Sequence, residues 1–335
     1  MSRGGYDEHD VEHYDRPGRR TRPRTKERPS HADAVPARVI TVDRGRYSCM
    51  LEDATAVVAM KSRSLGRKGV VVGDRVRLVG DVSGTEGSLA RVVEVDDRQA
   101  VLRRTADDDD PVERVVVANA DQLVMVTALA DPPPRHGFID RALAAAYDAG
   151  IEPLLCLTKA DLASPDELLE LYRPLGVEHV VTRRGGDLDE LRAHLRDRAS
   201  VFLGHSGVGK STLVNALVPE ANRSTGLVNA VTGRGRHTST SAYAWRLPFG
   251  GWVFDTPGIR SFGLAHVDSD RLIHAFGDLL EFTDECPRGC THGETEPECG
   301  LDLAVADGRL DPVRVASFRR ILASRERTEA DERTR

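Results

Sequence analysis

The chain has 335 residues, with 47 Lys and Arg residues against 53 Asp and Glu residues, a formal net charge of −6 and a hydrophobic fraction of 40%. This length suffices for roughly two or three domains with cores of their own, and the composition excludes collagen-like, mucin-like and fully disordered chains. No segment approaches the roughly 18 apolar residues of a membrane span, and the N-terminus shows no secretory signal. We therefore expect a cytoplasmic protein with no membrane partner.

The net charge hides an uneven distribution along the chain. Between Arg16 and Arg28, seven basic residues face one acidic residue, and this composition predicts a disordered basic arm over residues 1–35. Such an arm is either a solubilising tail or a segment that neutralises phosphates with salt-sensitive affinity. Residues 36–105 also have a basic excess, 13 against 9, so the remainder is acidic. The charge of the whole chain therefore does not exclude a nucleic-acid partner.

Residues 36–105 contain five short apolar runs separated by turn signals, without a helical period. The runs are Ala37–Val42, Ser48–Leu51, Ala56–Ala59, Arg75–Leu78 and Ala90–Val95. This pattern predicts a five-stranded OB-type β-barrel, whose usual ligands are oligonucleotides. A small β-barrel without a nucleic-acid role has the same pattern. The acidic run Asp107–Asp110 before Pro111 predicts a linker at the end of this domain.

From residue 111 to about residue 265, apolar strands alternate with helical segments. The expected strands are Gln122–Leu129, Ile151–Leu157, Val177–Val181 and Val201–Leu203. The expected helices between them are Phe138–Ala149, one that opens at Ser164, and Leu188–Leu195. This alternation predicts an α/β domain with a mostly parallel sheet covered by helices on both faces. Ala242–Leu247 and Trp252–Phe254 then predict a hairpin.

A phosphate-binding loop follows the strand that ends at Leu203. Residues 204–211 match G-x-x-x-x-G-K-S between an apolar strand and a helix, which is the context that this motif requires. Glycines let backbone N–H groups approach phosphates, Lys210 adds a full positive charge, and the Ser211 hydroxyl can bind Mg²⁺. The expected nucleotide-binding residues here are Gly204, His205, Ser206, Gly207, Val208, Gly209, Lys210, Ser211 and Thr212.

A second segment after a strand predicts which base is bound. It consists of Thr158, Lys159, Ala160 and Asp161. The carboxylate of Asp161 can accept two hydrogen bonds from the ring N–H and the exocyclic amine of guanine, and adenine lacks this pair of donors. The alternative is a surface turn without a ligand. A P-loop ATPase or kinase is the weaker reading, because Asp161 argues against it.

A third segment, Asp255-Thr256-Pro257-Gly258, follows the strand Trp252–Phe254. Asp255 is placed to hold Mg²⁺ through water, and the Gly258 N–H to meet the γ-phosphate. The polar, glycine-rich segment Gly233–Thr240 predicts a switch loop, and we expect Thr238 to join Ser211 and Asp255 around Mg²⁺. The base-reading segment precedes the phosphate loop, so the chain is circularly permuted relative to the usual guanine-nucleotide fold.

Three cysteines and a histidine predict a metal site in the C-terminal domain, residues 266–335. Cys286, Cys290, His292 and Cys299 form C-x₃-C-x-H-x₆-C, four ligands of the types that structural tetrahedral Zn²⁺ prefers. A disulfide is disfavoured in a cytoplasmic chain, and the remaining cysteines, Cys49 and Cys156, lie in apolar strands as expected of core residues. Pro312–Arg325 predicts a helix with Val315, Phe318, Ile321 and Leu322 on one face.

The G-R-G-R-H-T segment, the D-T-P-G-I-R-S-F segment and the permuted order together resemble the ribosome small-subunit-dependent GTPases. The resemblance covers residues 36–325 and implies an rRNA-binding OB-fold, a permuted GTPase and a zinc-binding segment. It implies that Lys159 and Asp161 recognise guanine, with a second base-contacting loop near residues 182–185. The chain departs from the family pattern at Thr158, where Asn is more frequent, at Ser239, and in the zinc-ligand spacings.

The resemblance also implies a function: late maturation of the small ribosomal subunit, with GTP hydrolysis stimulated by the subunit and coupled to release. We expect a monomer that binds GTP or GDP. Ile259 follows Gly258 at the position where Ras-like enzymes carry a water-orienting Gln, so the resemblance nominates His237, with Lys210 and Gly258, as the catalytic set. His237 alternatively contacts only RNA or solvent. The alternative function is a nucleotide-regulated rRNA-binding module with negligible turnover.

Overall fold

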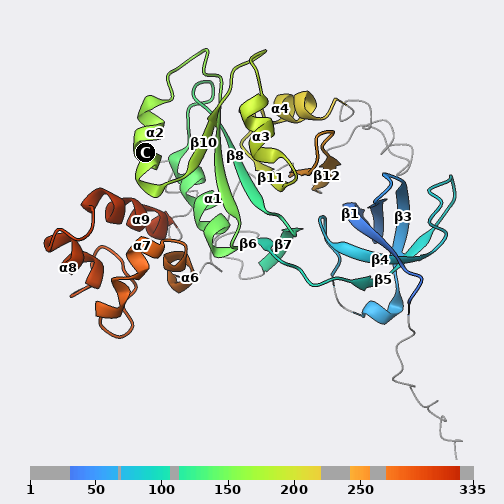
Figure 1. Cartoon of the computed structure of the whole chain (residues 1–335), viewed down its shortest axis with the longest axis horizontal. Helices are drawn as coiled ribbons and strands as arrows, with labels where there is room; N and C mark the ends of the chain where they lie inside the picture. The colour runs from blue at the N-terminus through green and yellow to red at the C-terminus, as the bar shows by residue number, and fades with distance from the viewer. Residues whose placement is uncertain (1–30, 67–68, 106–112, 220–241, 257–268, 325–335) are drawn as a thin grey trace, which may run out of the picture. The chain divides into compact units, whose positions relative to one another are not determined.

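The computed structural model describes residues 31–66, 69–105, 113–219, 242–256 and 269–324 (Figure 1). Several sequence predictions lie outside these residues, namely most of the basic arm, the acidic run Asp107–Asp110 and the expected switch loop Gly233–Thr240. In the part of the chain that the structure describes, no helix is both long enough and apolar enough to cross a membrane.

A closed barrel of five strands forms the first folded region (Figure 1). The strands are β1 (Val35–Asp43), β2 (Arg46–Leu51), β3 (Ala56–Lys61), β4 (Arg75–Gly80) and β5 (Ala90–Val95), with a 3₁₀ turn, η1, at Arg63–Leu65. Their order is β1-β2-β3-β5-β4, and β1 closes the barrel by pairing with both β2 and β4. The barrel interior contains buried Val39, Cys49 and Leu78. The predicted OB-type barrel is confirmed, and so is the core position of Cys49.

A two-stranded sheet follows the barrel and flanks the predicted linker. It consists of β6 (Val101–Thr105) and β7 (Glu113–Ala118), which pair antiparallel on either side of residues 106–112. Leu102 and Val117 are buried in the same apolar cluster as the helix that follows the next strand. These two strands therefore pack with the α/β core rather than with the interior of the barrel.

The second region is a six-stranded sheet in the order β10-β9-β8-β11-β13-β12. Its strands are β8 (Gln122–Ala128), β9 (Glu152–Thr158), β10 (Glu178–Val181), β11 (Ala199–Leu203), β12 (Tyr243–Arg246) and β13 (Trp252–Asp255). All neighbours pair parallel except the hairpin of β12 with β13. Both the mostly parallel sheet and the hairpin were predicted and are confirmed.

Helices cover both faces of this sheet because its strands are apolar on both sides. They are α1 (His136–Asp148), α2 (Asp166–Tyr172), α3 (Asp189–Leu195) and α4 (Lys210–Leu217), with the 3₁₀ turn η2 at Arg173–Leu175. Successive residues of β8 enter different clusters: Leu123 packs with the core that contains α1, and Val124 with the core that contains α3 and α4. Cys156 is buried in the second of these cores, as expected.

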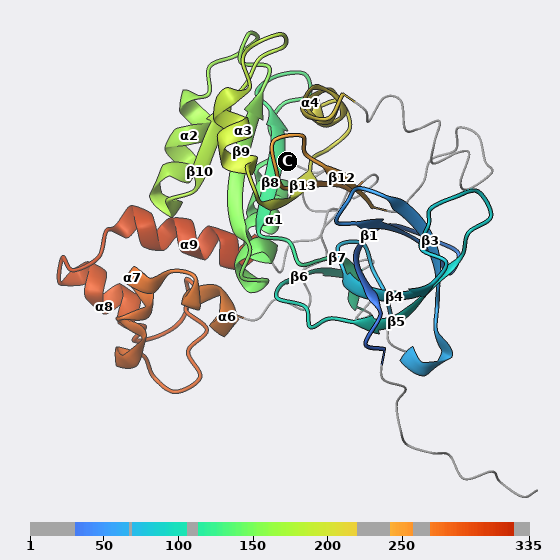
Figure 2. The ribbon, with the colours of Figure 1, turned by 45° about the vertical axis from the view of Figure 1, so that its right-hand side comes forward.

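The C-terminal region is helical around a cysteine-rich loop. It contains α6 (Ser269–His274), α7 (Gly277–Leu280), the 3₁₀ turn η3 (Thr283–Glu285), α8 (Gly300–Ala306) and α9 (Pro312–Ser324). The helix α9 lies alongside α1 (Figure 2). Its predicted apolar face is confirmed, since Val315, Phe318, Ile321 and Leu322 are all buried in the core that it shares with α1.

Candidate functional site

The three predicted nucleotide motifs follow three strands of one sheet. Thr158 ends β9, Gly204 follows β11, and Thr256 follows β13. In the sheet these strands lie in the order β9-β8-β11-β13 and run parallel, so their carboxyl ends share one edge. Ligands of open α/β sheets bind at this edge. The sheet thus brings together segments that are far apart in the sequence.

Glycines shape the phosphate loop for distinct reasons. Gly207 and Gly209 have φ angles of +85° and +93°, which side-chain-bearing residues rarely adopt. At Gly204 a Cβ atom would lie 2.6 Å from the carbonyl oxygen of Val126 in the neighbouring strand. The loop ends where α4 begins at Lys210, so the first N–H groups of that helix face the loop. This backbone is suited to binding phosphates.

Lys210 and Asp255 form an ion pair at the sheet edge, although they lie 45 residues apart in the sequence. The Lys210 ammonium group also lies 3.5 Å from the carbonyl oxygen of Thr256. The Thr256 hydroxyl donates to the carbonyl of Phe202 at 3.0 Å, which holds the end of β13 against β11. A phosphate-binding cation and a carboxylate therefore meet where the triphosphate and its metal ion are expected. The exposed hydroxyl of Ser211 and the Asp255 carboxylate are the oxygen ligands that Mg²⁺ prefers.

The base-reading segment is fixed to its surroundings while Asp161 is exposed to solvent. Ala160 donates its N–H to the carbonyl of Thr182 at 3.1 Å, so the expected second base-contacting loop lies next to the first. Lys159 has a φ angle of +59°, and its ammonium group donates to the carbonyl of Asp131. The Asp161 carboxylate is therefore accessible to a nucleotide.

The loop between β8 and α1 also borders the phosphate loop, and our sequence interpretation did not include it. Pro132 lies 3.5 Å from the position of a Cβ atom built on Gly207. The Phe138 ring packs on the His205 ring with centroids 4.1 Å apart. Burial, together with the charges of Arg135 and Arg141, lowers the pKa of His205 to about 4, so its imidazole is neutral at physiological pH. The sequence signal that could have identified this loop is its position after a strand of the sheet, which it shares with the three motifs.

Three predicted residues of the nucleotide site lie outside the described residues: His237, Thr238 and Gly258. Ile259 lies outside them as well. Their assignments stay predictions.

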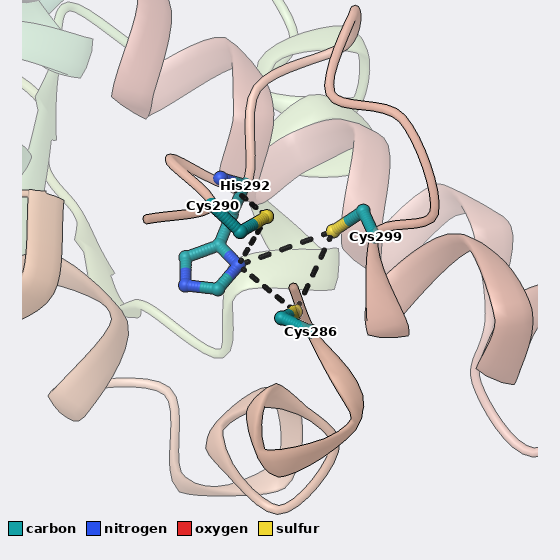
Figure 3. A group of neighbouring side chains, drawn as sticks. All are labelled: Cys286, Cys290, His292 and Cys299. Carbon is teal, nitrogen blue, oxygen red and sulfur yellow. Dashed lines mark hydrogen bonds between the residues drawn. The ribbon is translucent and has the colours of Figure 1, made fainter. Parts of the chain in front are cut away.

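The second candidate site is the cluster of Cys286, Cys290, His292 and Cys299 (Figure 3). The Nδ1 atom of His292 lies 3.6 Å from the Sγ atoms of Cys286 and Cys290 and 3.9 Å from that of Cys299. The Sγ atoms of Cys286 and Cys299 are 4.0 Å apart. Tetrahedral zinc bonds place sulfur about 3.5 Å from nitrogen and about 3.8 Å from another sulfur. The four donor atoms therefore fit one tetrahedral metal ion.

Neighbouring groups orient these ligands. The Gly300 N–H donates to the Cys286 sulfur at 3.1 Å, and a Cβ atom on Gly300 would lie 2.2 Å from the carbonyl oxygen of Phe282. His292 has a φ angle of +60°, and Arg319 of α9 donates to its carbonyl oxygen at 3.0 Å. Without a metal, burial and the neighbouring thiols raise the pKa of Cys290 to about 12. A bound cation reverses this shift, because it stabilises the negatively charged thiolate. The cluster is thus suited to a structural metal ion.

Comparisons with known proteins agree with this geometry. The family model of the RsgA GTPase matches residues 95–265. The small ribosomal subunit biogenesis GTPase RsgA of Chlorobaculum parvum is 39% identical over 273 residues, which are 78% of this chain and 88% of that protein. The protein of the same name from Pseudomonas aeruginosa is 46% identical over 223 residues, 64% of this chain and 65% of that protein.

Two solved structures are similar to most of this chain. YjeQ from Thermotoga maritima superposes with a TM-score of 0.62 at 26% identity, covering 88% of this chain and 99% of that chain. YloQ, described as a circularly permuted GTPase, gives a TM-score of 0.62 at 25% identity over 90% of this chain and 98% of that one. The predicted circular permutation of the chain is thereby confirmed.

Proposed function

Because this chain belongs to the RsgA GTPase family, we propose that it hydrolyses GTP to GDP and phosphate during late maturation of the small ribosomal subunit. The subunit stimulates hydrolysis, and hydrolysis is coupled to release of the protein. The observation that supports this most directly is the meeting of Lys210 and Asp255 at the sheet edge, beside Ser211. These are the groups that hold the phosphates and the metal ion of a nucleoside triphosphate.

Different residues of the chain bind the phosphates, the base and the metal ions. The N–H groups of residues 204–212 and the Lys210 ammonium group hold the phosphates, while Asp161, with Lys159 beside it, selects guanine. Ser211, Asp255 and Thr238 would hold Mg²⁺, which neutralises charge on the phosphate oxygens when bound. Gly258 would donate its N–H to the γ-phosphate. The cysteine cluster would hold one structural Zn²⁺ through Cys286, Cys290, His292 and Cys299.

The attacking water needs a group to orient it, and Ile259 cannot supply one because its side chain is apolar. We assign this role to His237, which the subunit would bring into place by ordering the switch loop. An enzyme with this arrangement has slow turnover alone and fast turnover on the ribosome.

We assign rRNA binding to the outer surface of the five-stranded barrel. Its exposed side chains include several arginines: Arg44, Arg46, Arg63, Arg75 and Arg91. Exposed guanidinium groups neutralise phosphates and release counterions, which gives RNA binding its salt dependence. Since small subunits mature in the cytoplasm, we place the protein there, acting as a monomer.

The alternative function is a nucleotide-regulated rRNA-binding module with negligible turnover, and Ile259 is the observation that favours it. The test is phosphate release from GTP across a titration of purified small subunits. We expect turnover to rise with subunit concentration. Turnover that stays negligible at saturating subunits, with GTP still bound, would establish the alternative.

The specificity control is Asp161→Asn. The amide of Asn keeps one acceptor for the ring N–H of the base and replaces the other acceptor by an NH₂ donor. That donor suits the C2 carbonyl of xanthine and not the exocyclic amine of guanine. We expect weaker GTP binding and stronger binding of xanthosine triphosphate. Tighter binding of ATP than GTP by the unmodified chain would contradict the guanine assignment.

A further inference from the structure

The base-reading segment and the phosphate loop are joined by one short side-chain hydrogen bond. The Thr158 hydroxyl donates to the carbonyl oxygen of Val208 at 2.6 Å. Thr158 is the last residue of β9, and Val208 lies within the phosphate loop after β11. β8 separates these two strands in the sheet, so the bond spans the nucleotide-binding edge.

The Thr158 side chain is buried next to the phosphate loop. The residue is 5% exposed, and a Cβ atom built on Gly209 would lie 3.8 Å from its Oγ1 atom. The other acceptor near this hydroxyl is the carbonyl oxygen of Thr127 at 3.4 Å. A hydroxyl has a single proton, and the distances assign it to Val208. This hydroxyl therefore donates its proton to the phosphate loop and has none left to donate to a bound base.

We propose that Thr158 is a positioning residue that holds the phosphate loop against the base-reading segment, and that selection between bases is left to Asp161. This inference rests on the proposed function, because it concerns how the same nucleotide site is built. Asp161 is exposed at the end of the segment, whereas Thr158 is buried. The two residues, three positions apart, therefore have separate tasks.

The decisive variant is Thr158→Val, which keeps the shape of the side chain and removes the hydroxyl. The buried Val208 carbonyl then loses a hydrogen-bond donor, and the phosphate loop loses its link to β9. A lost buried hydrogen bond of this kind corresponds to about a tenfold change in an equilibrium constant. We expect the affinities for GDP and GTP both to fall about tenfold, and Thr158→Ser, which retains the hydroxyl, to restore them.

Whether the loss of nucleotide affinity in Thr158→Val depends on the base distinguishes a positioning role of Thr158 from direct contact with the base. Affinities are measured with fluorescent guanosine diphosphate for the unmodified chain and Thr158→Val. They are then measured with xanthosine diphosphate for Asp161→Asn alone and combined with Thr158→Val. A positioning role predicts the same loss, within about twofold, for both bases, because additive effects indicate independent contributions. A loss that depends on the base would overturn the proposal by showing that Thr158 contacts the base.

Ser200→Ala is the matched control. The Ser200 hydroxyl is buried and donates to Gln122 at 3.2 Å, at the opposite end of β11 from the phosphate loop. We expect this variant to lower the melting temperature without altering nucleotide affinity. If Thr158→Val does not fold, Thr158→Ala is used in the same comparison, with the melting temperature measured for each variant.

The outcomes separate this inference from the function on which it rests. If the unmodified chain binds no guanine nucleotide, the proposed function and this inference both fail. If it binds GDP and GTP while Thr158→Val binds them equally well, only the inference fails.

Discussion

Arg320 of α9 forms an ion pair with Asp140 of α1 at 3.3 Å, and the Asp140 side chain is 3% exposed. The same guanidinium group lies over the Tyr172 ring, 5.0 Å from its centroid, and donates to the carbonyl of Leu171. One side chain of the C-terminal helix thus contacts both α1 and α2. Two positions before Asp140, Phe138 packs against the phosphate loop.

Replacing Arg320 by Met should destabilise the folded protein strongly. Burial raises the pKa of Asp140, and the charge of Arg320 opposes this shift. Without the guanidinium group a buried carboxylate has lost its charged partner, which costs about 3 kcal/mol or more. Urea unfolding at pH 7, followed by circular dichroism, measures the loss.

The pH dependence of this loss follows from the sign of the shift. Removing Arg320 raises the folded-state pKa of Asp140 further above its unfolded value. The deficit of Arg320→Met should therefore be small below about pH 4, where the carboxyl is protonated in both states, and grow as pH rises. Arg309→Met is the control, because Arg309 pairs with exposed Glu285 and surface pairs contribute about 0–1 kcal/mol. Equal losses in the two variants would contradict the assignment.

Cys299→Ser should abolish metal binding by the C-terminal cluster. Cys299 is buried and supplies one of the four donor atoms, and its replacement leaves three. We expect the zinc content of the purified protein, measured by atomic emission, to fall from about one per chain to near zero. Glu294→Gln, an exposed change in the same loop, should retain the metal. Full zinc content in Cys299→Ser would show that the site lies elsewhere.

His237→Ala should reduce subunit-stimulated GTP turnover while nucleotide affinity is retained. A misplaced attacking water costs about 100-fold in rate, so a loss of this size is expected at saturating subunits. The readout is kcat for phosphate release, with the dissociation constant of GDP measured in parallel. Ser239→Ala serves as a control in the same segment. Unmodified stimulated turnover in His237→Ala would exclude the water-orienting role.

Arg91→Gln should weaken binding to the small subunit and reduce its salt dependence. Arg91 is exposed on β5, and one lost phosphate contact lowers the slope of log affinity against log salt by about 1. Sedimentation of the protein with subunits between low and moderate salt measures the slope. Glu94→Gln removes an exposed charge of opposite sign from the same strand and should not reduce binding. An unchanged slope in Arg91→Gln would place the RNA contact on another surface.

The motifs were predictable from the sequence because each depends on residue types at short spacing. Gly204, Gly207 and Gly209 are needed by the backbone of one loop, and the cysteine cluster spans only 14 positions. The barrel and the parallel sheet were predictable too, since alternating apolar residues and turn signals are local patterns. The pair β6 and β7 was not predicted, because it encloses the acidic run that indicated a linker.

The uneven charge along the chain, the nucleotide motifs and their permuted order are properties of the sequence by itself. The tertiary structure alone decided which side chains meet across elements. Thr158 contacts Val208 over 50 positions, His205 packs on Phe138, and Arg320 reaches Asp140 over 180 positions. No local pattern encodes such pairs, because they depend on strand order and on which helix face is buried. The sequence predicted which residues bind the nucleotide and the metal ions, and the fold determined which neighbouring side chains hold those residues in place.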